Sequence, residues 1–165
     1  MSAPITATPA VRRLPGAAAF PAAIISAVVA GDLASYAISA IAHAAGVSRS
    51  FSPLQPATFT ALIVMGVLVG GLGWQLVRTR AGRPGRLLSR LVPFVLLLSF
   101  IPDLLLGIAH GLDATWGGVA ALMCMHVAVA AAAVTSYSLF LPFSSQAVAD
   151  TAGTRPPVTS KLATR

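Results

Sequence analysis

Four long apolar stretches constrain this chain more than any other feature of its sequence. They run over residues 17–45, 57–77, 87–109 and 116–141. Each can cross a hydrocarbon core about 30 Å thick, which takes about 20 helical residues. Backbone groups in lipid must be hydrogen-bonded internally, and the sequence lacks the alternating polarity of a closed barrel. We therefore predict an all-α polytopic membrane protein, a four-transmembrane-helix bundle.

The composition excludes most other classes of protein. Of the 165 residues, 56% are hydrophobic and only 9% are charged, whereas an average soluble domain carries about 25% charged residues. A net charge of +7 would suggest nucleic-acid binding in a soluble protein. Here the basic residues flank the apolar stretches, so we predict the lipid bilayer as the partner and no nucleic acid. Cys124 is the single cysteine, which excludes an intramolecular disulfide.

The chain divides into three parts. Residues 1–14 form an N-terminal tail, residues 15–142 the transmembrane domain, and residues 143–165 a tail rich in Ser, Thr, Ala and Pro. Because the last segment is polar and lacks a periodic apolar pattern, we predict that it is disordered.

The basic residues predict an orientation. With four spans, ten of the eleven Lys and Arg side chains fall on one side of the membrane and Arg49 falls on the other. The positive-inside rule then predicts a multi-pass protein of the bacterial inner membrane with both termini in the cytoplasm. Trp116 would mark the outer interface, and Trp74 and Tyr137 the inner one. The alternative for the first stretch is a signal peptide cleaved after Ala30, although its apolar sequence exceeds the ~7–15 residues of a signal.

Polar side chains inside the predicted spans are the candidate functional residues. An aspartate at the centre of a membrane helix costs about 2.5–3.5 kcal/mol, so it normally faces protein or water. The rise per residue places Tyr36, Asp103 and His126 in one layer, with Asp32 one turn deeper. We predict one polar intramembrane cluster composed of Asp32, Tyr36, Ser99, Asp103 and His126. The alternative is that these are only interhelical contacts, worth about 0.6 kcal/mol each.

Helical spacing assigns these side chains to faces. Asp32, Tyr36, Ser39 and His43 share one face of the first stretch, and Ser99, Asp103 and His110 share one face of the third. Pro102 directly precedes Asp103 and leaves one backbone carbonyl without its helical donor, which predicts a kink beside the carboxyl group.

Two other patterns concern packing and metal ions. Gly66, Gly70 and Gly73 give the second stretch a groove of small residues, which predicts close helix packing within the bundle or between two copies of the chain. The run MCMH at residues 123–126 contains ligands that suit Cu(I). Only Met123 and His126 share a helical face, so we predict neither a metal site nor a cofactor.

Two segments carry a resemblance to a known family. Residues 98–106 (LSFIPDLLL) and 122–131 (LMCMHVAVAA), together with four spans and a basic central loop, resemble an uncharacterised family of small actinobacterial four-helix membrane proteins, a domain of unknown function. The resemblance covers about residues 17–141. It implies the fold, and it carries no activity, ligand or catalytic residue.

Two kinds of function fit these observations. The first is transport or ligand binding through the polar cluster, with transport requiring a homo-oligomer because one small chain makes a narrow pathway. The second is an accessory or regulatory subunit that contacts another membrane protein through the glycine face. No nucleotide-binding loop, zinc-protease motif or nucleophile elbow occurs in the sequence. We therefore predict no catalytic residues, and an enzyme is the weakest of the three interpretations.

Overall fold

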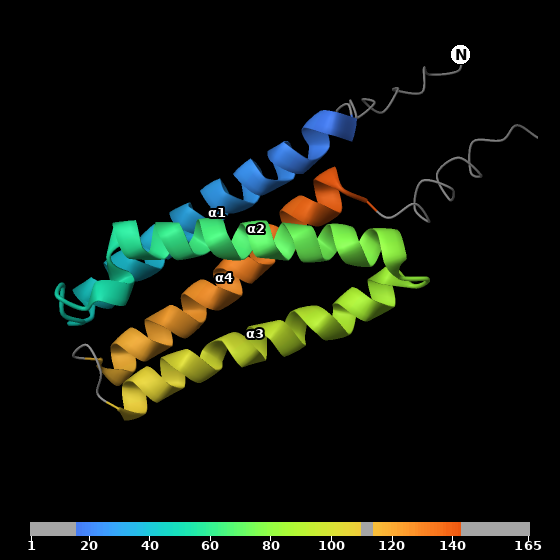
Figure 1. The fold of residues 1–165 in the computed structure, drawn as a ribbon. Coiled ribbons are helices and arrows are strands. Elements are labelled where there is room, and N and C mark those ends of the chain that lie inside the picture. The colour runs from blue at the N-terminus through green and yellow to red at the C-terminus, as the bar shows by residue number, and fades with distance from the viewer. Residues whose placement is uncertain (1–15, 110–113, 143–165) are drawn as a thin grey trace, which may run out of the picture.

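The computed structural model describes residues 16–109 and 114–142 of the chain. This part of the chain forms four α-helices, α1 (Gly16–Ala44), α2 (Pro56–Arg80), α3 (Pro84–Ile108) and α4 (Trp116–Phe140), and a 3-10 turn, η1 (Ser52–Leu54), without strands (Figure 1). All four helices are long and apolar enough to cross a membrane, which indicates a multi-pass membrane protein. The predicted all-α, four-helix fold is confirmed. Both predicted tails, residues 1–14 and 143–165, and His110 lie outside the described residues.

The helix ends follow local sequence signals. Pro56 and Pro84 begin α2 and α3, where the missing N–H is not needed. Thr115 caps α4, because its Oγ1 accepts a hydrogen bond from the backbone N–H of Gly118 at 3.2 Å. The basic loop predicted at 78–86 shortens to residues 81–83, since α2 and α3 both extend beyond their apolar stretches. Arginine side chains allow this extension because their long stems let the charged group reach water.

The most extensive helix pair is α1 with α4; α2 crosses this pair and contacts both helices, and α3 lies along α4 (Figure 1). The buried face of α1 carries a small residue at every fourth position: Ala19, Ala23, Ala27, Gly31, Ser35 and Ser39. Small side chains let two helix backbones approach closely, which is the main source of packing energy between helices in lipid. This seam is therefore the structural centre of the bundle.

The outer surface of the bundle is apolar along most of its length. Large exposed side chains occur on every helix, for example Ile25, Leu62, Leu97 and Leu139, the last with 71% of its surface exposed. In a water-soluble protein such a surface would aggregate. In a bilayer it contacts acyl chains, so this surface supports the assignment to a membrane.

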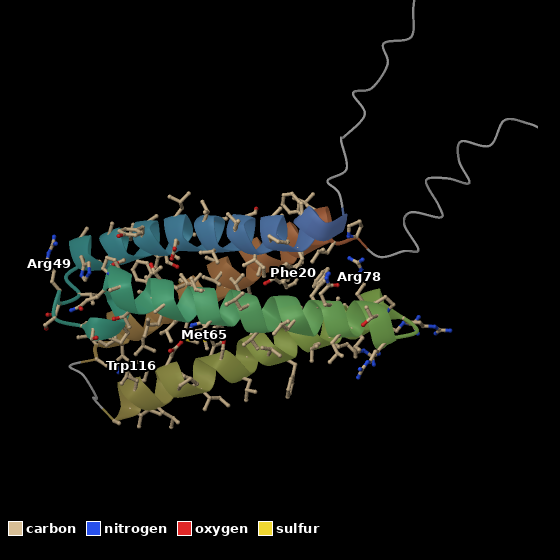
Figure 2. All side chains as sticks on the ribbon, turned by 45° about the horizontal axis from the view of Figure 1, so that its top comes forward. Phe20, Arg49, Met65, Arg78 and Trp116 are labelled. Carbon is tan, nitrogen blue, oxygen red and sulfur yellow. The ribbon has the colours of Figure 1, made fainter. Side chains whose placement is uncertain are left out.

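Charged and aromatic residues distinguish the two ends of the bundle. Arg49 lies at one end together with Trp116, and Arg78 lies toward the other (Figure 2). Trp74 and Tyr137 do not face a membrane interface as predicted, because they are only 5% and 2% exposed and their rings pack 5.5 Å apart. Their polar atoms are bonded inside the protein, Trp74 Nε1 to the carbonyl of Leu141 at 3.3 Å and the Tyr137 hydroxyl to another backbone carbonyl.

Candidate functional site

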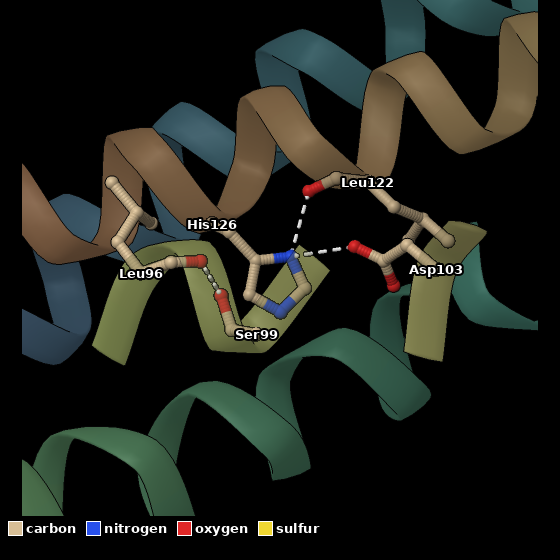
Figure 3. Close-up of polar contacts among 5 residues, drawn as sticks. All are labelled: Leu96, Ser99, Asp103, Leu122 and His126. Atoms are coloured by element: carbon tan, nitrogen blue, oxygen red, sulfur yellow. Dashed lines mark hydrogen bonds and ion pairs between the residues drawn. The ribbon is translucent and has the colours of Figure 1, made fainter. Parts of the chain in front are cut away.

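Asp103 of α3 and His126 of α4 form a close polar contact between two helices. Asp103 Oδ2 lies 3.1 Å from His126 Nδ1, with 10% of the aspartate side chain and 38% of the histidine side chain exposed (Figure 3). Gly107 makes the approach possible, because a Cβ atom at this position would lie 2.9 Å from Val119 on α4. The prediction from helical rise that these two side chains share one layer agrees with this distance.

A backbone carbonyl fixes the orientation of the imidazole ring. His126 Nδ1 is 2.9 Å from the carbonyl oxygen of Leu122, one turn earlier on α4 (Figure 3). A carbonyl only accepts hydrogen bonds, so we assign the Nδ1 proton to this contact. Asp103 Oδ2 is near the same nitrogen but is buried without a hydrogen bond from any described residue. In the neutral ring, Nε2 is then a second acceptor without a partner among the described residues, and it belongs to the more exposed of the two side chains.

Phe100 and Ser99 complete the surroundings on α3. The ring of Phe100 meets the imidazole edge to face, with centroids 6.2 Å apart. The Ser99 hydroxyl donates to the carbonyl of Leu96 on its own helix at 2.7 Å and makes no hydrogen bond to the pair (Figure 3). Pro102 lies within α3, which continues as one helix to Ile108. The predicted kink at Pro102 stays a prediction.

An apolar groove lies beside this pair. Its volume is about 460 Å³, and it is lined by Phe100, Met123, Cys124, Val127, Ala128 and Ala131. Phe100 belongs to both features, since its ring contacts His126 and also lines the groove. The only titratable side chain on the wall of the groove is Cys124, among the residues the structure describes.

The other two predicted cluster residues are directed toward α2. Asp32 Oδ1 accepts a hydrogen bond from the Thr60 hydroxyl at 3.1 Å. The ring of Tyr36 packs edge to face on Phe59, with centroids 5.3 Å apart, and 53% of Tyr36 remains exposed. Both partners belong to the first turns of α2. The face of α1 that carries Asp32 and Tyr36 therefore packs against α2.

The structure thus brings together two of the five predicted cluster residues. Among the described residues, Asp103 is paired with His126, and Asp32, Tyr36 and Ser99 make no hydrogen bond to either of them. The physical reason is the helix order, because α1 contacts α4 and α2 and has no extensive contact with α3.

The glycines of α2 have unequal surroundings. A Cβ atom at Gly70 would lie 3.6 Å from the Tyr137 hydroxyl, which is ordinary packing. Neither Gly66 nor Gly73 has any heavy atom that a Cβ would meet within 4 Å, so these two do not pack inside the bundle. Gly71 was not among the glycines selected from the sequence, yet it packs most tightly of those in α2. A Cβ atom added at Gly71 would lie 2.7 Å from Ile24 on α1.

Two further structural roles were not predicted from the sequence: Thr60 as the partner of Asp32, and the small residues of α1 as its packing face. Thr60 was not selected as the partner of Asp32, and a lone threonine in an apolar helix gives no signal for that role. The small residues at every fourth position of α1 were visible in the sequence and indicate a packing face. Ser35 lies on this face, and its hydroxyl is buried without a hydrogen-bond partner among the described residues.

No group of three or more His, Cys, Asp or Glu side chains that could hold a metal ion occurs within residues 16–109 and 114–142. Comparison with curated proteins and with solved structures found no significant match. A family model described as "Family of unknown function (DUF6069)" matches residues 15–139, which include nearly all of the four helices. The chain is therefore a member of this family, DUF6069, whose function is unknown.

Proposed function

We propose that this protein binds a small ligand inside the membrane at the Asp103–His126 pair. The observation that carries the proposal is a buried carboxylate oxygen, Asp103 Oδ2, which lacks a hydrogen bond although it lies 3.1 Å from an imidazole nitrogen. Ionisable side chains are rare at membrane depth, and a functional role is the default hypothesis for them. A buried acceptor without a donor costs about 1–3 kcal/mol, which a bound ligand would offset.

The free atoms of the pair define the chemistry of the ligand. With the Nδ1 proton directed at Leu122, both Asp103 Oδ2 and His126 Nε2 accept hydrogen bonds. A complementary ligand therefore donates hydrogen bonds, as a hydroxyl or an amine does. Because the neighbouring groove is apolar, the rest of the ligand is expected to be apolar as well.

The packing favours ligand binding over transport by a single chain. Small residues bring α1 and α4 close together, and Ala23 and Ala27 at this seam have no exposed surface. The polar groups form separate contacts, Asp32 with Thr60 and Asp103 with His126, instead of one continuous row. A transport path would need such a row, or a second copy of the chain to supply it.

The test compares two aspartates that both lie within membrane helices. The wild type, Asp103→Asn and Asp32→Asn are purified in the same mild detergent, and the small molecules that co-purify with each are measured by mass spectrometry. We expect one compound bound near stoichiometry in the wild type and in Asp32→Asn, and lost in Asp103→Asn. Equal recovery from all three proteins, or no such compound in the wild type, would refute the proposal.

We also propose that the protein lies in a bacterial inner membrane with both termini in the cytoplasm. The support is the ten-to-one distribution of Lys and Arg between the two sides. Ten arginines against one lysine, typical of a GC-rich genome, are in keeping with an actinobacterial source.

The orientation is tested in a Cys124→Ala background by labelling Ser50→Cys and Gly82→Cys with an impermeant maleimide on intact cells. Labelling of Ser50→Cys alone is expected, and labelling of Gly82→Cys alone would reverse the orientation.

A second candidate function is that of an accessory subunit, and it rests on α2. Gly66 and Gly73 have open space around them, and the large side chains of Leu62, Met65 and Val69 beside them are exposed. Small residues on an exposed membrane helix are typical of helix–helix association. In this case Gly66→Leu would abolish association with a second copy or another membrane protein, while Asp103→Asn would not.

A further inference from the structure

A second groove lies at the end of the bundle that carries Arg49, away from the Asp103–His126 pair. It has a volume of about 410 Å³ and lies between the last turns of α1 and the start of α2. Its walls include Tyr36, Ala40, His43, Ala44, Arg49 and Pro56. Arg49 is the one basic residue predicted on the opposite side of the membrane from the other ten, and Figure 2 shows it at the tip of this end.

Three polar groups on this groove lack hydrogen bonds to the described part of the protein. His43 Nδ1 is bonded to the carbonyl of Val47 at 3.0 Å, so the neutral ring leaves Nε2 as a free acceptor. The Tyr36 hydroxyl is unbonded, while its ring is held against Phe59. The guanidinium of Arg49 has no acidic partner among the residues described. Together these groups offer a cation, a hydroxyl donor and a hydrogen-bond acceptor.

Apart from Ser39, whose hydroxyl donates to the carbonyl of Leu54 at 3.0 Å, the rest of the groove is apolar and follows the axis of α1. Tyr36, Ala40 and Ala44 are four residues apart and therefore share a face that is about 12 Å long at 1.5 Å per residue. The polar group at the open end, Arg49, belongs to the loop beyond the helix, where a membrane helix reaches the interface. A ligand that matches this layout has a charged head and an apolar chain.

We propose that this groove binds an anionic phospholipid whose headgroup carries a hydroxyl. Its phosphate pairs with Arg49, a headgroup hydroxyl donates to His43 Nε2, and one acyl chain lies along the Tyr36–Ala44 face. Arginine suits a phosphate because its guanidinium donates two parallel hydrogen bonds. Free phosphate matches only the Arg49 end, because it has no apolar part to lie against the alanine and proline walls. This site is separate from the proposed function, and neither depends on the other.

The experiment uses full-length protein in nanodiscs that contain a phosphatidylglycerol with a photoreactive acyl chain. After irradiation, the cross-linked residues are mapped by mass spectrometry. The matched comparison replaces one arginine at each end of the bundle, Arg49→Gln at the groove and Arg80→Gln at the other end. Tyr36→Phe is a second groove variant that keeps the ring on Phe59. Circular dichroism and gel filtration verify that each variant is folded.

We expect cross-links on the Tyr36–Ala44 face in the wild type and in Arg80→Gln. In Arg49→Gln their yield should fall about fivefold, since one arginine near a membrane surface contributes about 1 kcal/mol to anionic-lipid binding. Three outcomes would overturn the proposal: an equal yield with a photoreactive phosphatidylcholine, an unchanged yield in both Arg49→Gln and Tyr36→Phe, or full loss of the cross-link when inorganic phosphate is added. The last outcome would identify free phosphate as the ligand.

Discussion

Gly118 provides the sharpest test of how the loop after α1 packs on α4. A Cβ atom at this position would lie 2.9 Å and 3.1 Å from two ring carbons of Phe51, a residue that is only 1% exposed. Carbon atoms pack at about 3.5–4.0 Å, so the ring would have to move by about 0.6 Å or more. Phe51 has little free space for that movement, because it belongs to the buried core. Overpacking of this kind costs about 1–3 kcal/mol.

We therefore predict that Gly118→Ala lowers the free energy of unfolding by about 1–3 kcal/mol. The matched control is Gly66→Ala, because a Cβ at Gly66 meets nothing within 4 Å. The control should be neutral or slightly stabilising, since glycine within a helix is less favourable than alanine by about 0.5–1 kcal/mol. Reversible unfolding by SDS in mixed micelles, followed by circular dichroism, measures both variants.

The difference in unfolding free energy between these two alanine variants tests whether Phe51 packs against α4 at Gly118. If Gly118→Ala were as stable as Gly66→Ala, then Phe51 would not be seated against α4, and the packing described for this loop would be refuted. If both variants were destabilised equally, the loss would reflect membrane-helix glycines in general. Only a difference of about 1 kcal/mol or more between them supports the close contact.

Three further predictions use the same unfolding assay or a measure of association. Tyr137→Phe removes the hydroxyl that donates to the Val67 carbonyl and should cost about 0.6 kcal/mol, with an upper limit near 1.7; no change would mean that water replaces this contact. Asp32→Ala removes the acceptor of Thr60 and should cost a similar, small amount, whereas a loss beyond ~2 kcal/mol would show that Asp32 is more than a helix contact. Gly66→Leu should leave unfolding unchanged and lower any self-association seen by cross-linking, and a large loss of stability would place Gly66 inside the bundle.

The sequence predicted the helices well because hydropathy and length respond to the membrane itself. The four predicted stretches fall within a few residues of α1, α2, α3 and α4. The shared depth of Asp103 and His126 was also predictable, since helical rise sets depth whatever the neighbouring helix is. The boundaries at the basic loop were missed because arginine ends an apolar stretch without ending a helix.

The order of the helices could not be predicted in the same way. In a soluble bundle the apolar face of each helix points to the core, but in lipid the outer face is apolar too. α4 shows the difficulty, because it is apolar all round and yet contacts each of the other three helices. Asp32 was therefore assigned to the pair of Asp103 and His126, although its actual partner is Thr60. A polar residue indicates that a partner exists, but not which helix supplies it.

The two polar contacts have different structural consequences because they join different helices to the central seam. α1 and α4 are held together by small residues. α2 is attached to both of them, through Thr60 to Asp32 on α1 and through the Val67 carbonyl to Tyr137 on α4, whereas α3 is attached to α4 through Asp103 and His126. Asp32 Oδ1 accepts a hydrogen bond from Thr60, whereas Asp103 Oδ2 is buried without one from any described residue. α3 is also the least buried of the four helices. A ligand that donates a hydrogen bond to Asp103, as proposed above, would therefore stabilise the docking of α3 on α4 in particular.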